Sequence, residues 1–328
     1  MRLVSEHETP DGYVTYADVM REVSRLLDAD DLQAALDVLT NAGPRFPSQL
    51  GHVHLFRASL TNRLGRPDEA IAILRTALDT GTRFPEKLLR GSKGLAPLTG
   101  RADFEALVVA FDAAFMRASI ETLASLELLR PSGAMPARGW PLLLALHGNR
   151  STPELERHNW TAPAGDGVLV ALLGSSLPAW TPGYRVWDDR DQAMRDVTDA
   201  LKRLGEEERI DPALVVLGGF SAGGLRAIEF ALAPTSSVSC VVTVAAYLTD
   251  ELVAELPSTV GRTDLAMHLV IGERDTCLEA HRRFAQRLEQ DGVRHVLDVR
   301  PGLGHVYPDD MSAVLRQAVA SASSATSG

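Results

Sequence analysis

Short apolar runs alternate with helix-like stretches over the last two-thirds of this 328-residue chain. The apolar runs are predicted strands and cover residues 142–146, 168–173, 214–217, 238–245, 265–271 and 296–299. The stretches between them that favour helices include residues 189–204, 225–233 and 281–290. Strands that are apolar on both sides need cover on both faces. The alternation therefore predicts a doubly wound α/β fold with a mostly parallel sheet.

The first third of the chain carries a helical pattern instead. Between residues 15 and 115, apolar side chains recur at spacings of three and four, without a strand pattern. Residues 32–39 are echoed 35 positions later, so that Ala35 aligns with Ala70 and Leu39 with Leu74. This period is close to the ~34 residues of a tetratricopeptide repeat. Residues 58–81 resemble the helix–turn–helix unit of that family.

The resemblance to tetratricopeptide repeats covers barely two units, and fewer than three full repeats rarely stand alone. Two interpretations are open. The helices form a docking surface for a protein partner or for a second copy of the chain, or they are an extension that caps the neighbouring domain.

Three segments follow from these patterns. We expect a helical, tetratricopeptide-like domain at residues 1–116, an α/β domain at 117–318 and a disordered, low-complexity tail at 319–328. At the start of the second domain, Ile120, Leu123, Leu126 and Leu128 are read as one or two strands.

Charge and composition exclude several kinds of partner. The formal net charge is −10 and aromatic residues make up only 5% of the chain, so neither nucleic acid nor an anionic membrane surface is an expected partner. The N-terminus has no apolar leader, and the two cysteines do not suggest a disulfide framework. We therefore expect a cytoplasmic protein.

The segment Gly219-Phe220-Ser221-Ala222-Gly223-Gly224 carries the sharpest chemical signal. It follows a predicted strand directly and precedes an apolar helix, which is the context of a nucleophile elbow. Small residues two positions either side of the serine let the turn approach the adjacent strand and helix. A plain Gly-Gly turn is the alternative. The context favours Ser221 as a nucleophile.

With that motif, the chain from about residue 117 onward resembles the α/β-hydrolase superfamily, in particular serine esterases of the phospholipase/carboxylesterase and dienelactone-hydrolase-like groups. The resemblance implies that an acid and then a histidine follow the serine along the chain. It points to Asp275, in the Gly272-Glu273-Arg274-Asp275 loop, as the acid that fixes the histidine tautomer. Glu273 is the nearest competitor.

The same resemblance points to His305 as the catalytic base, because it lies in a Gly-His loop after the last predicted strand. His281 lies in a polar helix and His295 opens a strand, so we interpret both as surface or structural histidines. For the oxyanion hole, it implies the amide of Ala222 and that of Asn149, which follows a His-Gly pair. His147 is then a loop-shaping residue.

Two tryptophans lie in a turn-rich loop after a predicted strand, at the edge where open α/β sheets place ligands. An aromatic wall for substrate formed by Trp180, Tyr184 and Trp187 is one interpretation, and ordinary loop packing is the other. No metal-ligand spacing or phosphate-binding loop is present in the sequence, so no metal or cofactor is expected.

The leading hypothesis is a serine hydrolase that cleaves a carboxylic ester or thioester of a small-molecule acyl substrate through an acyl-enzyme. An acyltransferase or cyclase, or a peptidase, would use the same three residues. From a different class, the chain is a non-catalytic interaction protein whose repeats bind a partner. The intact order of Ser221, Asp275 and His305 argues against that last reading.

Overall fold

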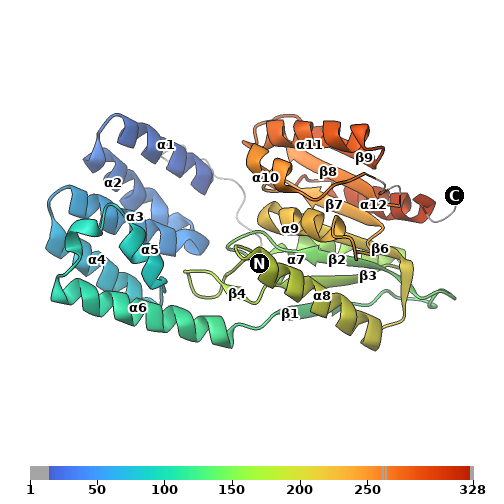
Figure 1. Ribbon diagram of the computed structural model, residues 1–328, viewed down its shortest axis with the longest axis horizontal. Coiled ribbons are helices and arrows are strands. Elements are labelled where there is room, and N and C mark those ends of the chain that lie inside the picture. The colour runs from blue at the N-terminus through green and yellow to red at the C-terminus, as the bar shows by residue number, and fades with distance from the viewer. Residues whose placement is uncertain (1–14, 261, 263, 326–328) are drawn as a thin grey trace. The chain divides into compact units, whose positions relative to one another are not determined.

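The computed structural model describes residues 15–260, 262 and 264–325 (Figure 1). These residues divide into two compact units. The helical unit contains residues 15–122 together with Pro178–Tyr184, and the α/β unit contains Leu123–Leu177 together with the described residues from Arg185 onward. Both the helical region and the mostly parallel α/β sheet that the sequence predicts are present.

The helical unit is built from helices that pack in sequence order, α1 against α2 and α3 against α4. Its described helices are α1 (Tyr16–Asp28), α2 (Leu32–Ala42), α3 (Leu50–Arg63), α4 (Pro67–Asp79), α5 (Glu86–Gly91) and α6 (Ala102–Glu121), with short 3-10 turns η1 (Gly43–Arg45), η2 (Pro47–Gln49) and η3 (Ala96–Leu98). Thr15 and Asp18 form a capping box that starts α1, because each side chain accepts the other's backbone N–H, at 3.2 Å and 2.9 Å.

The residue pairs that repeat at a spacing of 35 have the same environment. Ala35 and Ala70 are both fully buried, and so are Leu39 and Leu74. Small residues at matching positions of α2 and α4 let each helix pack closely on its neighbour. The assignment to the tetratricopeptide family itself stays a prediction.

A loop from the middle of the chain completes the helical unit. Pro178–Tyr184 leaves the α/β unit and returns to it, yet it is grouped with the helices. The Gly51 amide donates to Thr181 Oγ1 at 2.9 Å, and the Arg83 amide donates to the Trp180 carbonyl at 3.0 Å. The Trp180 ring lies 5.8 Å from the Phe84 ring, edge to face. The sequence gives no sign of this insertion.

Seven strands of the described chain form one sheet in the order β1-β3-β2-β6-β7-β8-β9. They are β1 (Ser125–Leu129), β2 (Trp140–Leu146), β3 (Leu169–Gly174), β6 (Ile210–Phe220), β7 (Cys240–Val244), β8 (Ala266–Gly272) and β9 (Arg294–Arg300), and a separate short pair joins β4 (Leu177–Pro178) to β5 (Arg185–Val186). Only the pairing of β1 with β3 is antiparallel among these neighbours. The carboxyl ends of the six parallel strands therefore meet at one edge of the sheet.

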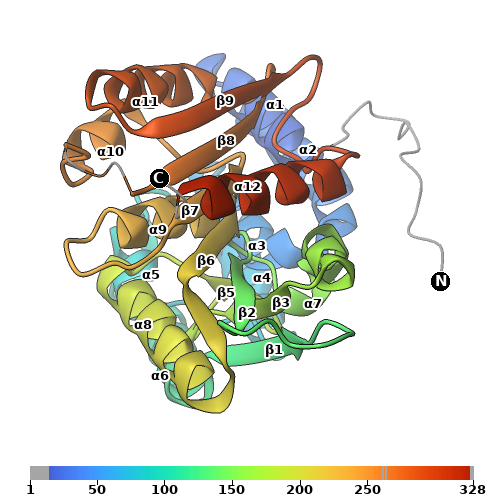
Figure 2. The ribbon, with the colours of Figure 1, turned by 90° about the vertical axis from the view of Figure 1, so that its right-hand side faces the viewer.

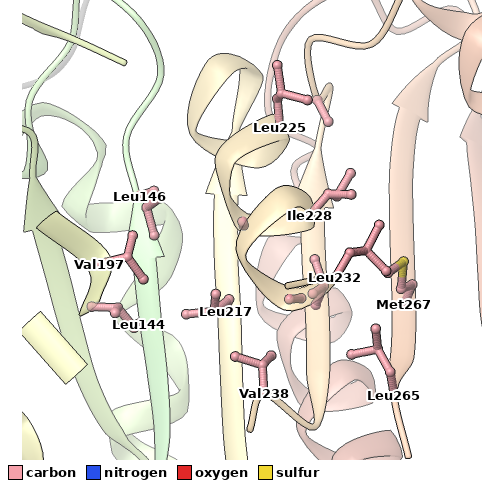
Figure 3. Close-up of a cluster of buried hydrophobic side chains, with 14 of the residues drawn as sticks. Leu144, Leu146, Val197, Leu217, Leu225, Ile228, Leu232, Val238, Leu265 and Met267 are labelled. Atoms are coloured by element: carbon pink, nitrogen blue, oxygen red, sulfur yellow. The ribbon is translucent and has the colours of Figure 1, made fainter. Parts of the chain in front are cut away.

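Helices cover both faces of this sheet, as buried strands require. On one face lie α8 (Arg190–Glu207), α9 (Ser221–Ala231), α10 (Asp250–Glu255) and α11 (Leu278–Gln290), and on the other lie α7 (Pro153–Trp160), η4 (Ala162–Asp166) and α12 (Met311–Ala325) (Figure 2). Each face of the sheet has its own hydrophobic core, and alternate residues of β2 point into the two. Leu144 belongs to the core under α8, α9 and α11, and Leu143 to the core under α7 and α12. Figure 3 shows Leu144 and Leu217 on their strands beside Ile228 of α9.

Two boundaries differ from the sequence-based expectation. Ile120 is the penultimate residue of helix α6 and is 75% exposed, so it belongs to no strand, and the division between the units follows Thr122 rather than residue 116. Residues 319–325 continue α12 instead of forming a disordered tail, because the small side chains of Ala318 and Ala322, one turn apart, are buried against the sheet. Residues 326–328 of the expected tail lie outside the described residues.

Within residues 15–325, leaving aside positions 261 and 263, no helix has the length and apolar character needed to cross a membrane.

Candidate active site

Ser221 occupies a sharp turn between strand β6 and helix α9. Its φ of 52° lies in the left-handed region, which costs free energy for a residue with a side chain and is concentrated at functional sites. A Cβ on Gly219 would lie 2.5 Å from the Gly223 carbonyl, and one on Gly223 would lie 2.3 Å from the His147 carbonyl oxygen. Both glycines are therefore required for the turn to close. The predicted strand–turn–helix context of Ser221 is present.

The structure brings Ser221, His305 and Asp275 into one chain of hydrogen bonds. His305 Nε2 lies 2.9 Å from Ser221 Oγ, and His305 Nδ1 lies 2.7 Å from Asp275 Oδ2. Asp275 follows β8, and His305 lies in the loop between β9 and α12. These loops meet because β6, β8 and β9 are parallel and end at the same edge of the sheet.

Asp275 is placed to hold the imidazole. Burial raises the pKa of Asp275, but hydrogen bonds from His305 and from the Cys277 amide outweigh that effect, so the net pKa lies below its ordinary value. The carboxyl is therefore ionised near neutral pH and accepts the His305 Nδ1–H. The competitor Glu273 points elsewhere, because its Oε2 accepts the Gly302 amide at 2.8 Å.

His147 is locked as a neutral imidazole. Its Nδ1 lies 2.7 Å from the Gly148 carbonyl, which can only accept, so Nδ1 carries the proton. Its Nε2 then accepts the Ser175 amide at 3.2 Å. Burial lowers the pKa of His147 to about 4. Since both nitrogens are occupied, this ring cannot act as the proton acceptor for Ser221.

The other two histidines lie away from the reacting atoms. His295 is on β9 and its Nδ1 lies 3.0 Å from the Val293 carbonyl. His281 is fully buried on α11, so of the two alternatives it fits a structural histidine and not a surface one. Its Nδ1 lies 2.9 Å from the Cys277 carbonyl, whereas its Nε2 has no hydrogen-bond partner among the described residues. The polar composition of α11 concealed this inward-facing position.

The two amides expected to form an oxyanion hole come from the start of α9 and from the loop after β2. Ala222 is in the first turn of α9, where backbone N–H groups have no acceptor inside the helix. Asn149 lies between Gly148 and Arg150, whose amides donate to Glu156 and to the Arg185 carbonyl. The Asn149 side chain is itself held by the Trp187 amide and by Asp188, each at 2.6 Å.

Of the three residues in the predicted aromatic wall, Trp187 is packed inside the α/β unit. Trp187 is fully buried and its Nε1–H donates to the His147 carbonyl at 2.7 Å, so it supports the loop and presents no surface to a ligand. Trp180 and Tyr184 belong to the inserted segment of the helical unit, where the Tyr184 carbonyl accepts the Ala179 amide at 2.9 Å. The alternative interpretation, loop packing, describes the positions of Trp180 and Trp187.

Two exposed apolar residues beside the reacting groups went unnoticed in the sequence. Tyr247 is 50% exposed and its amide donates to the Ser221 carbonyl at 2.9 Å, and Val306, next to His305, is 40% exposed. Tyr247 comes three residues after β7, at the same edge of the sheet as Ser221. Tyr247 could have been identified in the sequence because it follows the end of a predicted strand.

Metal ligands do not gather at this edge. Within the described part of the chain, no group of three or more His, Cys, Asp or Glu side chains is arranged to hold a metal ion.

Comparison with known proteins agrees with the fold. The sequence profile of the phospholipase/carboxylesterase family matches residues 146–321. NocK of Nocardia uniformis subsp. tsuyamanensis, which is provisionally named an esterase, is 36% identical over 111 residues, 31% of this chain. The matched region spans about a third, 32%, of that relative's length.

One solved structure extends the likeness to most of the chain. An uncharacterised protein from Bacillus cereus ATCC 10987 is 22% identical, with a TM-score of 0.51, and the match covers 93% of this chain and 97% of that chain. At this level of identity the likeness concerns the fold alone, and it includes both units. The esterase Est2 of Thermogutta terrifontis is 18% identical, with a TM-score of 0.46, over 63% of this chain and 88% of its own. With the family profile matching more than half of its residues, this chain belongs to the phospholipase/carboxylesterase family of α/β-hydrolases.

Proposed function

We propose that this protein is a serine hydrolase that cleaves a carboxylic ester or thioester through an acyl-enzyme at Ser221. One observation carries the proposal: His305 bridges Ser221 Oγ at 2.9 Å and Asp275 Oδ2 at 2.7 Å, within a family of esterases. Asp275 orients the ring so that Nε2 is the acceptor.

In the first half of the reaction, His305 Nε2 takes the proton of Ser221 while Oγ attacks the substrate carbonyl carbon. The negative charge that develops on the carbonyl oxygen is held by the amides of Ala222 and Asn149. Collapse of this intermediate breaks the ester or thioester bond, and His305 gives the proton to the departing alcohol or thiol. An acyl group remains on Ser221.

In the second half, His305 takes a proton from a water molecule while the water oxygen attacks the acyl carbon. His305 then returns that proton to Ser221 Oγ as the acyl–serine bond breaks, and the acid is released. An acyltransferase would replace that water with another nucleophile, and a peptidase would release an amine in the first half. Tyr247 and Val306 offer apolar surface beside Ser221 and support a substrate with an apolar group next to its carbonyl. We place the reaction in the cytoplasm, where the free, buried Cys240 and Cys277 would stay reduced.

The test uses a fluorophosphonate probe and intact-mass spectrometry. We expect one adduct, located at Ser221 by peptide mapping, and no adduct on the Ser221→Ala variant, which should keep the native circular dichroism spectrum. A panel of esters, thioesters and amides with increasing acyl length, run with and without an added alcohol or amine, then separates hydrolysis from acyl transfer and from peptide cleavage. Labelling at another residue, or full turnover by Ser221→Ala, would reject the proposal.

A further inference from the structure

A buried carboxylate on helix α7 is bonded to the loop that carries Asn149. Glu156 is 8% exposed, and the Gly148 amide donates to its two carboxylate oxygens at 2.9 Å and 3.1 Å. The loop backbone lies close against the elbow here, because a Cβ on Gly148 would lie 2.7 Å from the Phe220 ring. The His147–Gly148 peptide, one before the peptide that carries the Asn149 N–H, is therefore held by one buried carboxyl side chain.

The same carboxylate reaches the loop that carries His305. The Tyr307 hydroxyl donates to Glu156 Oε2 at 2.6 Å and accepts the Trp160 Nε1–H at 3.0 Å. An indole N–H can only donate, so the Tyr307 oxygen accepts from Trp160 and its hydroxyl hydrogen is left to donate to Glu156. Trp160 is 1% exposed. The buried Glu156 and Trp160 thus share hydrogen bonds with the partly buried Tyr307 in one polar network.

Aromatic packing connects this network to the residue before the nucleophile. The ring of Phe220, the residue before Ser221, stacks on Tyr307 with centroids 4.4 Å apart and an angle of 22°. The Phe220 ring also lies 5.2 Å from the His305 ring. Burial raises the pKa of Tyr307, so its hydroxyl keeps the proton that it donates to Glu156.

We propose that Glu156 is a positioning residue for this active site, and the inference rests on the proposed function. It fixes the His147–Gly148 peptide, which directly precedes the peptide that carries the Asn149 N–H, and so positions that N–H toward the developing oxyanion. Through Tyr307 it also ties this loop to the loop of His305. Glu156 does not touch the substrate. Its contribution appears only when charge develops on the carbonyl oxygen, and it therefore acts on the transition state rather than on substrate binding.

Three variants test this role. Glu156→Ala removes both contacts. Glu156→Gln keeps an acceptor for the Gly148 amide but turns a donor toward the Tyr307 hydroxyl, and Tyr307→Phe removes only the link to the histidine loop. Glu154→Gln is the matched control, because Glu154 is an exposed carboxylate on the same helix, two residues away.

The readouts are kcat, KM and the inhibition constant of a trifluoromethyl ketone matched to the best ester. Ser221 Oγ adds to the ketone carbon, its proton passes to His305, and the ketone oxygen becomes an oxyanion in the same hole. We expect Glu156→Ala to lower kcat about 10- to 100-fold, less than the about 100- to 1,000-fold of removing an oxyanion donor outright. The inhibition constant should rise by the same factor, with KM nearly unchanged.

Glu156→Gln and Tyr307→Phe should lose less, about 3- to 10-fold in kcat, again with a parallel rise in the inhibition constant. If Glu156→Ala does not fold, these two variants carry the test, since each keeps the volume of the side chain. Wild-type kcat and ketone affinity in both, or a loss that appears in KM instead, would overturn the positioning role.

The two proposals fail in different ways. A wild-type protein that takes no probe at Ser221 rejects the proposed function, and the role of Glu156 with it. A wild-type protein that is labelled at Ser221, with unchanged kinetics in Glu156→Gln and Tyr307→Phe, rejects the role of Glu156 alone.

Discussion

Different interactions predominate inside the helical unit and at the active-site edge of the α/β unit. In the helical unit, apolar contacts dominate: Leu39, Leu74 and Phe104 are fully buried, and ion pairs such as Arg90 with Glu105 are partly exposed and contribute little. At the edge of the α/β sheet, polar side chains are buried and bonded to one another. Residues that stabilise the helical unit and residues that carry the proposed chemistry are therefore separate sets, and single substitutions should affect one without the other.

Replacing His305 should produce the largest effect, and it should fall on activity alone. We expect His305→Ala to lower kcat/KM about 10⁵-fold, comparable to Ser221→Ala, because the two groups act as a unit. Initial-rate kinetics with the best ester check this loss. His295→Gln is the control, and equal losses in the two variants would contradict the assignment of the base.

Asp275→Asn should cost somewhat less, about 10⁴-fold in kcat/KM. An amide at this position donates to His305 Nδ1, which favours the tautomer with the proton on Nε2, and that tautomer cannot accept from Ser221. Glu273→Gln, in the same loop, keeps an acceptor for the Gly302 amide and should stay within about 3-fold of wild type. Steady-state kinetics with unchanged unfolding temperatures would support this assignment, and a larger loss in Glu273→Gln would reverse it.

Trp180→Ala should affect the stability of the helical unit and leave the α/β unit unchanged. Removing a partly buried indole that packs near Phe84 should destabilise the helical unit by about 2–3 kcal/mol, at the lower end for such truncations. Amide hydrogen exchange should become faster in α3 and α4 and stay unchanged in β6 and α9. Trp180→Phe, which keeps most of the packing, is the control. Faster exchange throughout both units would show that their stabilities are not separable.

The smallest effect concerns pH and stability. The pKa of His147 falls from 6.5 to about 4 on folding, so the unfolded chain takes up a proton between these values while the folded chain does not. Stability is therefore lost as pH falls, by about 2 kcal/mol between pH 7 and pH 5 from this group alone. Urea unfolding at several pH values gives the unfolding free energy as a function of pH. The loss of about 2 kcal/mol should be missing in His147→Gln and retained in the exposed control His158→Gln. If the unfolding free energy of His147→Gln depends on pH as in the wild type, the buried, neutral ring is contradicted.

The strands and helices of the α/β unit could be predicted because a strand buried on both faces is a continuous run of apolar residues in the sequence. The run at residues 168–173 became β3 (Leu169–Gly174), and residues 189–204 became most of α8 (Arg190–Glu207). The end of α12, residues 319–325, was missed because its serines and alanines resemble low-complexity sequence, and only packing against the sheet distinguishes it. Ser221 and the order of its partners could be predicted because the elbow needs particular residues at fixed positions.

Residues that act through distant partners could not be predicted in this way. Trp187 resembles a binding residue in sequence, and only the structure shows its N–H bonded to the His147 carbonyl. Glu156 is one of several charged residues at the start of α7, and nothing local shows that it alone is buried against Gly148 and Tyr307. Such contacts join segments far apart in the chain, so they depend on the finished fold.

The insertion of Pro178–Tyr184 into the helical unit bears on how such a protein can evolve. The chain passes between the units three times, after Thr122, after Leu177 and after Tyr184. A gene fusion that joined or removed a helical cassette at a single point would leave Trp180 and Thr181 without the helices they pack on. The two units must therefore be inherited as a pair, and recombination that exchanges one of them has to change the sequence in two places at once.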